Sequence, residues 1–281
     1  CESINIHEDM DKIKSEILRF DGAIICDITG QTRNDIIKYC FENSKRIYIS
    51  PKISDIIIRG GTDINLFDSP LLLCRNSGLS FEQRLFKRIF DIVVSVIGLI
   101  ILSPFMLIIA AAIKIDDGGS IIYKQKRLTI NGKEFFVYKF RSMIPNAEKN
   151  GVPQLATGSD SRITRVGKFL RKCRLDELPQ LFNIIKGDMS VVGPRPERPE
   201  LTEKYEREMP EFKFRLKVKA GLTGYAQVTG VYDTTPYDKL KMDLMYIERY
   251  SMVMDLRIIL MTIKTMISPG EMNSEADKEK Y

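Results

Sequence analysis

The sequence is almost without histidine. His7 is the only one among 281 residues, and it lies far from the polar motifs in the second half of the chain. Acid–base chemistry centred on histidine is therefore excluded at those motifs. The five cysteines are scattered without a CxxC spacing, so cysteine and histidine cannot form a zinc site. The same scatter suits a reducing compartment.

Two further signals are missing. No secretory signal peptide is recognisable, and the chain begins at Cys1, so we expect a piece of a longer protein. The first 75 residues contain no GxGxxG motif, and Gly60-Gly61 indicates only a turn. Dinucleotide binding by this region is therefore not favoured.

Helices and strands are nevertheless expected to alternate in the N-terminal part. The periodicity predicts helices over Met10–Phe20 and Asp35–Glu42. It predicts a short apolar strand over Ala23–Asp27 and further buried strands over Arg46–Ser50 and Leu71–Cys74. Such alternation indicates part of a parallel-sheet domain.

Positive charge is in excess. The chain carries 43 lysines and arginines against 37 aspartates and glutamates, which gives a net charge of +6 and a pI near 8.9. This balance favours anionic partners such as phosphates, acidic lipid headgroups or nucleic acid.

A long apolar run, Ile92–Ile113, contains 22 consecutive uncharged residues. Its length is enough to cross a bilayer, so an ordinary single span is one interpretation. Ser103-Pro104 lies at the middle of the run, where proline lacks an N–H and frees the carbonyl four residues earlier. The neighbouring serine can satisfy that carbonyl.

The charges around this run favour a second interpretation. Lysine and arginine flank both ends, whereas the positive-inside rule expects them at one end. We therefore expect a re-entrant helix over residues 87–114 that enters the membrane, bends at Ser103-Pro104 and returns to the same face. Asp91 is expected to pair with Arg88 or Lys87 near the entrance.

The most informative motif is RLDELPQLFNIIKGDMSVVGPRP, residues 174–196. Pro179 predicts that a helix begins near Asp176, and Gly187 predicts its end. One interpretation makes Asp176 and Glu177 a capping pair. The other uses the helix N-terminus as an anion site. Arg195, fixed between two prolines, suits bidentate phosphate binding.

Upstream of this motif, Ile121–Met143 predicts a β-hairpin that turns at Asn131-Gly132. Lys139 and Arg141 lie two residues apart, so an extended chain places both on one side. The next expected helix has its apolar face at Ile163, Val166, Phe169, Leu170 and Cys173. Its other face carries Arg162, Arg165, Lys168, Arg171, Lys172 and Arg174. This face is either solvated or binds anionic lipid headgroups. Nucleic acid binding is not favoured, because no aromatic residues interleave with the charges.

The remaining segments are less specific. Glu148–Ser161 predicts a mobile polar loop, and Glu197–Phe212 predicts a charged helix that ends at Pro210. Asp238–Tyr250 and Met254–Ile267 are amphipathic, so each packs on the core or lies in a membrane interface. We expect the tail, residues 269–281, to be disordered.

Three motifs in this order resemble the bacterial sugar transferase family, the monotopic phosphoglycosyl transferases. They are KFRSM at 139–143, RLDELPQLFNIIKGDMSVVGPRPE at 174–197 and AGLTGYAQV at 220–228. The resemblance covers roughly Phe86 to Ile267. Thr129 stands where family members usually carry glycine, which puts the geometry of the hairpin turn in question.

The resemblance implies transfer of a sugar 1-phosphate from a UDP-sugar to polyprenyl phosphate, with release of UMP. Asp176 would be the nucleophile that carries the phosphosugar, and Glu177 would orient the site or manage the proton. Lys139, Arg141 and Arg195 would neutralise phosphate charge. Mg²⁺ would be the cofactor, with Asp176 as a ligand and Asp188 as a weaker candidate.

The architecture implied is an α+β monotopic membrane protein at the cytoplasmic face of the bacterial inner membrane. Its parts would be a partial Rossmann-like accessory domain (1–75), a linker (76–85) and a transferase domain (86–268) with amphipathic interfacial helices. Membrane lipids are expected partners, and nucleic acid is not. A homo-oligomer remains open, as does the identity of the sugar.

Two other functions remain open from the sequence. A membrane-bound scaffold would bind nucleotide sugars without turnover, although it would not need the Asp176-Glu177 pair. A hydrolase would release the phosphosugar to water and would turn over without a lipid acceptor.

Overall fold

The structure is a computed structural model. It describes residues 3, 9–28, 30–66, 68–74, 78–144, 162–230 and 234–267. The loop predicted at Glu148–Ser161 and the tail predicted at 269–281 lie outside these residues. The chain divides into two compact units, Cys1–Asp55 and Ile56–Tyr281, which we describe one at a time. The domain boundaries expected from the sequence stay predictions.

The first unit is a β-α-β arrangement with one preceding helix. Helix α1 (Met10–Leu18) precedes strand β1 (Gly22–Ile25), helix α2 (Gly30–Glu42) and strand β2 (Arg46–Ile49). The two strands pair in parallel, which confirms the predicted alternation in this part of the chain. Its core contains Ile13, Ile17, Ile25, Ile36 and Cys40. The predicted burial of Arg46–Ser50 is wrong, because β2 is largely exposed.

An exposed hairpin stands near the start of the second unit. After helix α3 (Ile53–Arg59), strands β3 (Thr62–Leu66) and β4 (Ser69–Leu73) pair antiparallel. Every residue of both strands is exposed. The prediction of a buried strand at Leu71–Cys74 is therefore wrong: the apolar residues are present, but no described element covers either face.

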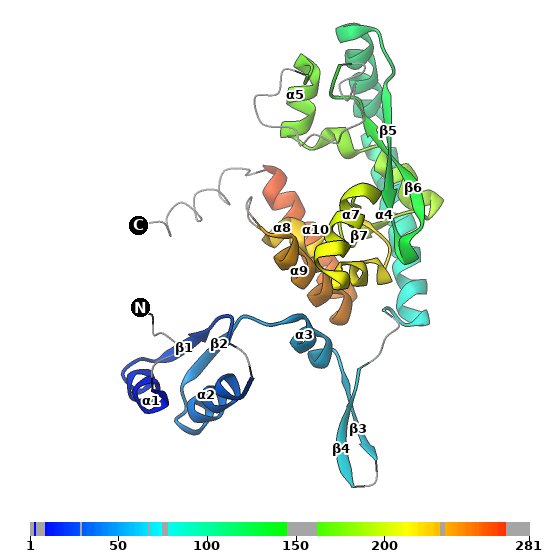
Figure 1. The fold of residues 1–281 in the computed structure, drawn as a ribbon. Coiled ribbons are helices and arrows are strands. Elements are labelled where there is room, and N and C mark those ends of the chain that lie inside the picture. The colour runs from blue at the N-terminus through cyan, green and yellow to red at the C-terminus, as the bar shows by residue number, and fades with distance from the viewer. Residues whose placement is uncertain are drawn as a thin grey trace. The chain divides into compact units, whose positions relative to one another are not determined.

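Helix α4 (Phe81–Asp117) is the longest element, with 37 residues and a length of about 55 Å. Ser80 begins it with a capping box to Gln83, and Gly118, in the left-handed conformation, ends it. The Ser103 hydroxyl donates to the Ile100 carbonyl over 3.0 Å, which is the carbonyl that Pro104 leaves without a donor. The predicted hydrogen bond from Ser103 is thus confirmed, and the helix (Figure 1) continues through Pro104. The predicted bend and return to the same membrane face stay predictions.

Helix α4 buries its polar face and exposes its apolar face, which is the reverse of the pattern in a soluble protein. Lys87, Asp91 and Ser95, which recur at a spacing of four, are buried against the rest of the unit. The exposed face is apolar and includes Ile92, Val93, Val96, Ile97, Ile100, Ile101, Phe105, Leu107 and Ile108. The most apolar 18-residue window has a mean hydropathy of 2.9 and is only 11% buried. This pattern favours contact with lipid rather than with a protein core.

A β-hairpin follows α4 as predicted. Strands β5 (Ile122–Leu128) and β6 (Glu134–Phe140) pair antiparallel around the turn η1 (Ile130–Gly132). Asn131 and Gly132 have positive φ and form the turn. Thr129 is extended; its hydroxyl donates to the Asp188 carbonyl and accepts from the Ala220 N–H. The threonine therefore ties the hairpin to the core.

The elements after the hairpin are all shorter than α4. They are α5 (Arg165–Lys172), η2 (Leu175–Glu177), α6 (Gln180–Lys186), β7 (Ser190–Val192), α7 (Pro199–Glu208), η3 (Pro210–Lys217), β8 (Gly221–Thr223), α8 (Tyr225–Thr229), α9 (Pro236–Glu248) and α10 (Met252–Ile267). Strands β7 and β8 pair in parallel. Phe169, predicted on the buried face of its helix, is 60% exposed.

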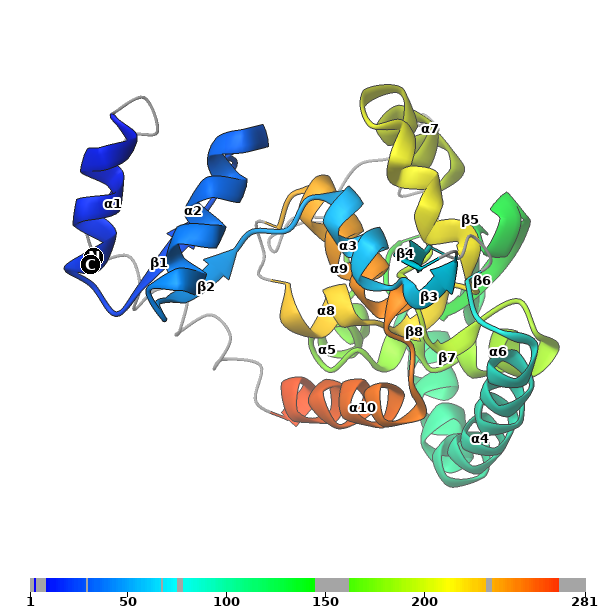
Figure 2. The same cartoon turned by 90° about the horizontal axis from the view of Figure 1, so that it is seen from below.

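The last two helices resolve the alternatives left by their amphipathic patterns. Helix α9 packs on the core through Leu240, Leu244 and Ile247, which are buried. Helix α10 lies at the edge of its unit (Figure 2) and exposes an apolar stripe of Val253, Leu256, Leu260 and Ile263. Core packing is therefore the role of α9, and the exposed stripe of α10 suits an interface.

A buried polar network joins α4 to the core. Lys87 pairs with Asp255 of α10 over 2.6 Å, and Tyr246 donates to the same carboxylate over 2.8 Å. Asp91 accepts hydrogen bonds from the Ser190 hydroxyl and from the backbone N–H of β7. The predicted pairing of Asp91 with Lys87 or Arg88 is replaced by these contacts.

Candidate active site

Asp176 and Glu177 lie in the 3₁₀ turn η2, one turn before α6. Helix α6 begins at Gln180 with Pro179 as its N-cap, so the prediction that Asp176 caps this helix is wrong. The predicted end at Gly187 is confirmed by its left-handed φ of 95°. Arg174, with φ 55°, ends the preceding α5 and turns the chain into η2. Few non-glycine residues adopt this conformation, which often marks a constrained functional segment.

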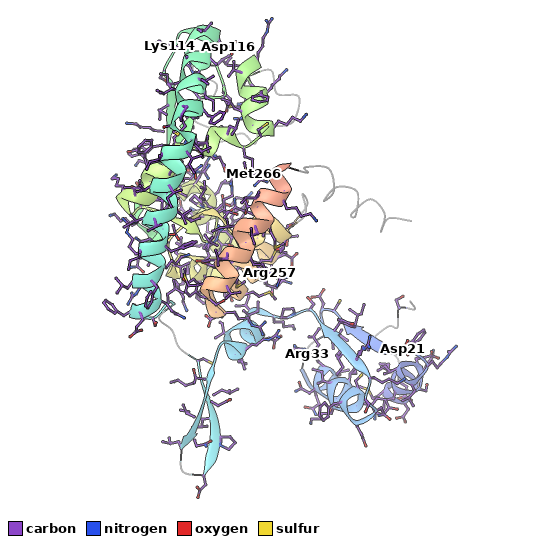
Figure 3. The ribbon with its side chains drawn as sticks, turned by 180° about the vertical axis from the view of Figure 1, so that it is seen from behind. Asp21, Arg33, Lys114, Asp116, Arg257 and Met266 are labelled. Atoms are coloured by element: carbon purple, nitrogen blue, oxygen red, sulfur yellow. The ribbon has the colours of Figure 1, made fainter. Side chains whose placement is uncertain are left out.

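Apolar packing fixes the position of η2. Ile109 and Ile113 of α4 form a buried cluster with Phe140 and Leu170, and Leu175 and Leu178 pack against it. The cluster lies towards the end of α4 that carries Lys114 and Asp116, beside α5 (Figures 1 and 3). The carboxylates of η2 therefore sit where the C-terminal part of the apolar helix meets the β-hairpin.

Glu177 is held by two cations. Its Oε1 accepts from Lys139 Nζ over 2.7 Å and from Arg195 over 3.0 Å. Burial raises the pKa of Glu177, but Arg195 and Lys139 outweigh burial and hold the pKa well below its ordinary value. Burial lowers the pKa of Lys139, and Glu177 offsets part of this change. The three side chains form one charged cluster with net positive charge.

Asp176 differs from its neighbour. Its side chain is buried, and within the described part of the chain no residue donates a hydrogen bond to its carboxylate. Burial raises the pKa of Asp176, and Lys139, Arg171 and Arg195 offset part of the shift. A buried carboxylate near cations with a shifted pKa is a candidate functional residue.

Lys139 is positioned through the contact between β6 and α6. Asn183 is fully buried in α6, and its side chain accepts from the Tyr138 N–H and donates to the Phe136 carbonyl. These two bonds dock the strand on the helix next to η2. Lys139 follows directly in β6 and reaches Glu177.

Arg195 is carried by a loop whose backbone is pinned at successive residues. The Gly193 N–H donates to β8, and the Pro194 carbonyl accepts from β8. A Cβ at Gly193 would collide with the Lys219 carbonyl, so glycine permits this close approach. The Arg195 carbonyl accepts from Arg215 over 3.0 Å. The Pro196 carbonyl accepts from Arg127 over 3.1 Å.

Two further residues expected at the site, Arg141 and Asp188, make other contacts. Arg141 packs its guanidinium against Gly119, just beyond α4. Asp188 follows α6 and pairs with Lys186, whereas Asp176 precedes the same helix. The seven residues of α6 separate them by about 10 Å along the axis. Their roles in phosphate and metal binding stay predictions.

Sequence reasoning missed two arginines. Arg171 of α5 contributes to the electrostatics of Asp176 and donates to the Ser142 hydroxyl over 2.8 Å. Arg215 is buried, pairs with the buried Asp243 over 2.8 Å and holds the Arg195 loop. Arg171 belongs to a charged helix face, so its spacing does not distinguish it from its solvated neighbours.

The chemistry of the donors suits a hard cation bound with substrate. Among the described residues no group of three histidine, cysteine or acidic side chains could hold a metal ion. The Asp176 carboxylate accepts no hydrogen bond from the described residues, so its oxygens are available to a cation. Mg²⁺ commonly binds through one or two carboxylates together with substrate phosphates and water, so a single carboxylate is sufficient.

The site therefore combines a buried carboxylate, a second carboxylate bound by two cations and an exposed apolar helix, and the helix suggests association with a membrane. Residues 82–269 match the bacterial sugar transferase family. The chain belongs to that family.

Several curated relatives show the same likeness. The chain is 42% identical over 185 residues to a UDP-N-acetylgalactosamine-undecaprenyl-phosphate N-acetylgalactosaminephosphotransferase of Aeromonas hydrophila, covering 65% of this chain and 44% of the relative. It is 43% identical over 211 residues to a UDP-glucose:undecaprenyl-phosphate glucose-1-phosphate transferase of Klebsiella pneumoniae, covering 73% and 43%. The chain thus spans less than half the length of these two relatives.

A shorter relative is covered almost completely. The exopolysaccharide production protein PSS of Rhizobium leguminosarum bv. phaseoli is 40% identical over 194 residues, which are 66% of this chain and 96% of the relative. The matched part of this chain therefore corresponds to nearly the whole of one family member.

Proposed function

We propose that this chain transfers a sugar 1-phosphate from a UDP-sugar to polyprenyl phosphate and so begins the assembly of a surface polysaccharide. The observation that carries the proposal is the contrast between two adjacent carboxylates. Asp176 is buried and accepts no hydrogen bond from the described residues, whereas Glu177 is fixed by Lys139 and Arg195. The names of the relatives supply the substrate classes.

In the first half-reaction, an Asp176 oxygen attacks the phosphorus that bears the sugar. The bond between this phosphorus and the oxygen bridging to UMP breaks, and UMP leaves with the electron pair. The sugar phosphate remains on Asp176 as an acyl phosphate. Lys139 and Arg195, already gathered by Glu177, neutralise the charge on the diphosphate.

In the second half-reaction, a phosphate oxygen of the polyprenyl phosphate attacks the same phosphorus. The bond to Asp176 breaks, the carboxylate is regenerated, and the product is a polyprenyl diphosphate sugar. Dividing the transfer into two steps avoids bringing a diphosphate and a phosphate monoester together at one time. Glu177 keeps both cations in place between the two steps.

Mg²⁺ bound by Asp176 and the diphosphate would supply charge neutralisation at the reacting phosphorus and the leaving group. The chain's own residues then orient the substrate: the pinned loop presents Arg195, and β6 presents Lys139. Asp188 remains a weaker ligand candidate because it lies beyond the far end of α6. Arg141 would contact phosphate only from the side of Gly119.

The covalent step is tested by Asp176→Asn, which removes the nucleophile with little change in size. We expect labelled UDP-sugar without lipid acceptor to leave the mass of one phosphosugar on the unmodified chain and none on the variant. Transfer to polyprenyl phosphate should fall by more than about a thousandfold. Normal transfer by a folded, membrane-bound variant would contradict the proposal.

The same assay separates the two other functions. A scaffold would bind the UDP-sugar and release no UMP, and a hydrolase would release free sugar phosphate repeatedly without polyprenyl phosphate. We expect a single burst of UMP in the absence of the lipid and continued release in its presence. Repeated turnover without the lipid would identify a hydrolase.

We further propose that α4 is re-entrant, so that both its ends face the cytoplasm at the bacterial inner membrane. Its exposed apolar face, the cations at both ends and the Ser103-Pro104 pair support this topology. The parallel β1-α2-β2 unit supports the accompanying proposal of a Rossmann-like accessory domain. The exposed stripe of α10 would lie in the same membrane interface.

Topology is tested with single cysteines in an active variant without the native cysteines. Ser69→Cys in the exposed hairpin and Lys126→Cys in β5 flank α4, and both positions are exposed. We expect both to be shielded from an impermeant thiol reagent in intact cells and labelled after lysis. Replacing Ser103-Pro104 by Leu-Leu should place them on opposite sides. Labelling of only one position in the unmodified helix would show that α4 spans the membrane.

A further inference from the structure

A cavity of about 440 Å³ lies near the N-terminal end of α4, between that helix, the start of β7 and the segment before β8. This volume is within the usual range for small-molecule sites. Five cationic side chains line it, and one carboxylate, Asp91, does so as well. The cations are Arg84, Lys87, Arg88, Lys217 and Lys219. None of them belongs to the charged cluster around Glu177.

Part of this charge is already used by the fold. Lys87 is paired with Asp255 over 2.6 Å. Arg88 donates to the last carbonyls of α6 over 2.6 and 2.7 Å. Asp91 accepts two hydrogen bonds from β7, so its carboxylate is turned to the core.

Two cations of the cavity have no such partner. In the described part of the chain, the side chains of Arg84 and Lys219 form neither a hydrogen bond nor an ion pair. The Lys219 amine lies beside the Arg88 guanidinium, next to Gly187. Burial and then Arg88 lower the pKa of Lys219. An anion in the cavity would offset the repulsion between Lys219 and Arg88 and would accept hydrogen bonds from Arg84 and Lys219.

Apolar residues form the other side of the cavity and continue out of it. Leu79, Phe81 and Leu85 belong to the lining. From Leu85 an exposed apolar strip runs along one face of α4 at helical spacing. It consists of Leu85, Ile89, Ile92, Val96 and Ile100, which are 50%, 53%, 37%, 39% and 69% exposed. The strip is about 22 Å long at 1.5 Å per residue.

We propose that this cavity binds the phosphate headgroup of an anionic phospholipid whose acyl chain lies along the strip from Leu85 to Ile100. Arg84 and Lys219 contact the phosphate, and Leu79 and Phe81 cover the glycerol end of the chain. A water-soluble anion would use the same two cations but would make no contact with the strip, whereas a phospholipid would use both. The site is distinct from the transfer site, and the bound lipid would hold the start of α4 at the membrane surface.

The proposal is tested by native mass spectrometry of the full chain released from nanodiscs of equal parts phosphatidylglycerol and phosphatidylcholine. We expect the unmodified chain to retain phosphatidylglycerol preferentially. Arg84→Gln with Lys219→Gln should weaken this retention by about tenfold to thirtyfold, because each cation near a lipid surface contributes about 1 kcal/mol. Lys204→Gln with Lys213→Gln removes the same charge at two exposed positions outside the cavity and should change nothing.

A second variant tests the acyl chain separately. Leu85→Gln leaves both cations in place and should also lower phosphatidylglycerol retention. It keeps the test decisive if the double variant does not fold. Equal retention of the two lipids by the unmodified chain would overturn the proposal. Full displacement by inorganic phosphate would indicate a free-anion site, and preference for polyprenyl phosphate would indicate a substrate site; either result would also overturn it.

Discussion

Replacing the buried pair Arg215–Asp243 tests whether the hydrogen bond from Arg215 is needed to position the Arg195 loop. Arg215 is 5% exposed and Asp243 is 2% exposed, and their atoms approach to 2.8 Å. Arg215 also donates to the Arg195 carbonyl over 3.0 Å. One side chain therefore contributes both to stability and to the position of Arg195, which we propose contacts the substrate, and the two contributions are separable.

The contribution of this ion pair to stability is measured by removing only one of its two charges. Asp243→Asn leaves the Arg215 charge buried, with only Glu197 at 3.7 Å as a remaining carboxylate. Removing one partner of a buried ion pair costs about 3–5 kcal/mol, and the remaining carboxylate favours the lower end. We expect a fall in Tm of roughly 6–12 °C, measured by thermal unfolding of the purified chain in detergent.

The positioning contribution appears when both charges are removed together. Arg215→Met with Asp243→Leu replaces the pair by apolar residues of similar volume, so the free energy of unfolding should return to within about 1 kcal/mol of the unmodified value. The Arg195 carbonyl would still lack its donor. We expect kcat/KM for the UDP-sugar to stay about tenfold to a hundredfold lower, because small displacements of a positioning group are costly.

A matched control removes an ion pair away from the loop. Arg33→Met with Asp55→Leu replaces a pair of the first unit, whose atoms approach to 2.7 Å, and should leave kcat/KM unchanged. A stable Arg215/Asp243 double variant with normal kcat/KM would refute the positioning role. In that case the pair serves stability alone.

Three further predictions concern the charged cluster. Arg171→Gln removes a cation that lowers the pKa of Asp176, so this pKa should rise further. The acid limb of the pH profile of kcat/KM should then move to higher pH. An equal movement in the exposed control Lys168→Gln would contradict this prediction. Glu177→Gln should lower kcat without preventing slow formation of the phosphosugar intermediate, because Asp176 remains, and rapid mixing with mass analysis would measure both. Exhaustive chelation should abolish transfer and Mg²⁺ should restore it best, whereas full activity after chelation would remove the metal from the proposal.

Local chemistry in the sequence predicted several features correctly. Pro104 requires that one carbonyl find another donor, and Ser103 supplies it. Gly187 ends a helix because it adopts a positive φ easily. The turn at Asn131-Gly132 forms for the same reason. Each of these depends on residues within four positions of one another, which is the range over which sequence patterns are informative.

Features that depend on distant partners were not predictable in the same way. Helix spacing indicated the charge interaction of Asp91 with Lys87, but not the hydrogen bonds of Asp91 to residues 99 and 100 positions away in β7. Arg215 meets the Arg195 carbonyl only because two segments 20 residues apart fold together. The apolar residues of β4 predicted burial, but burial requires a covering element that strand periodicity does not specify.

The bond between Lys87 and Asp255 joins the first part of α4 to the last described helix, across 168 residues of sequence. During synthesis α4 leaves the ribosome long before α10, so Lys87 has no Asp255 to pair with until α10 has been made. A chain shortened before Asp255 would retain the complete transfer motif and yet leave a buried ammonium without a partner. We therefore expect such nascent or truncated chains to be degraded rather than to accumulate as partly active enzyme.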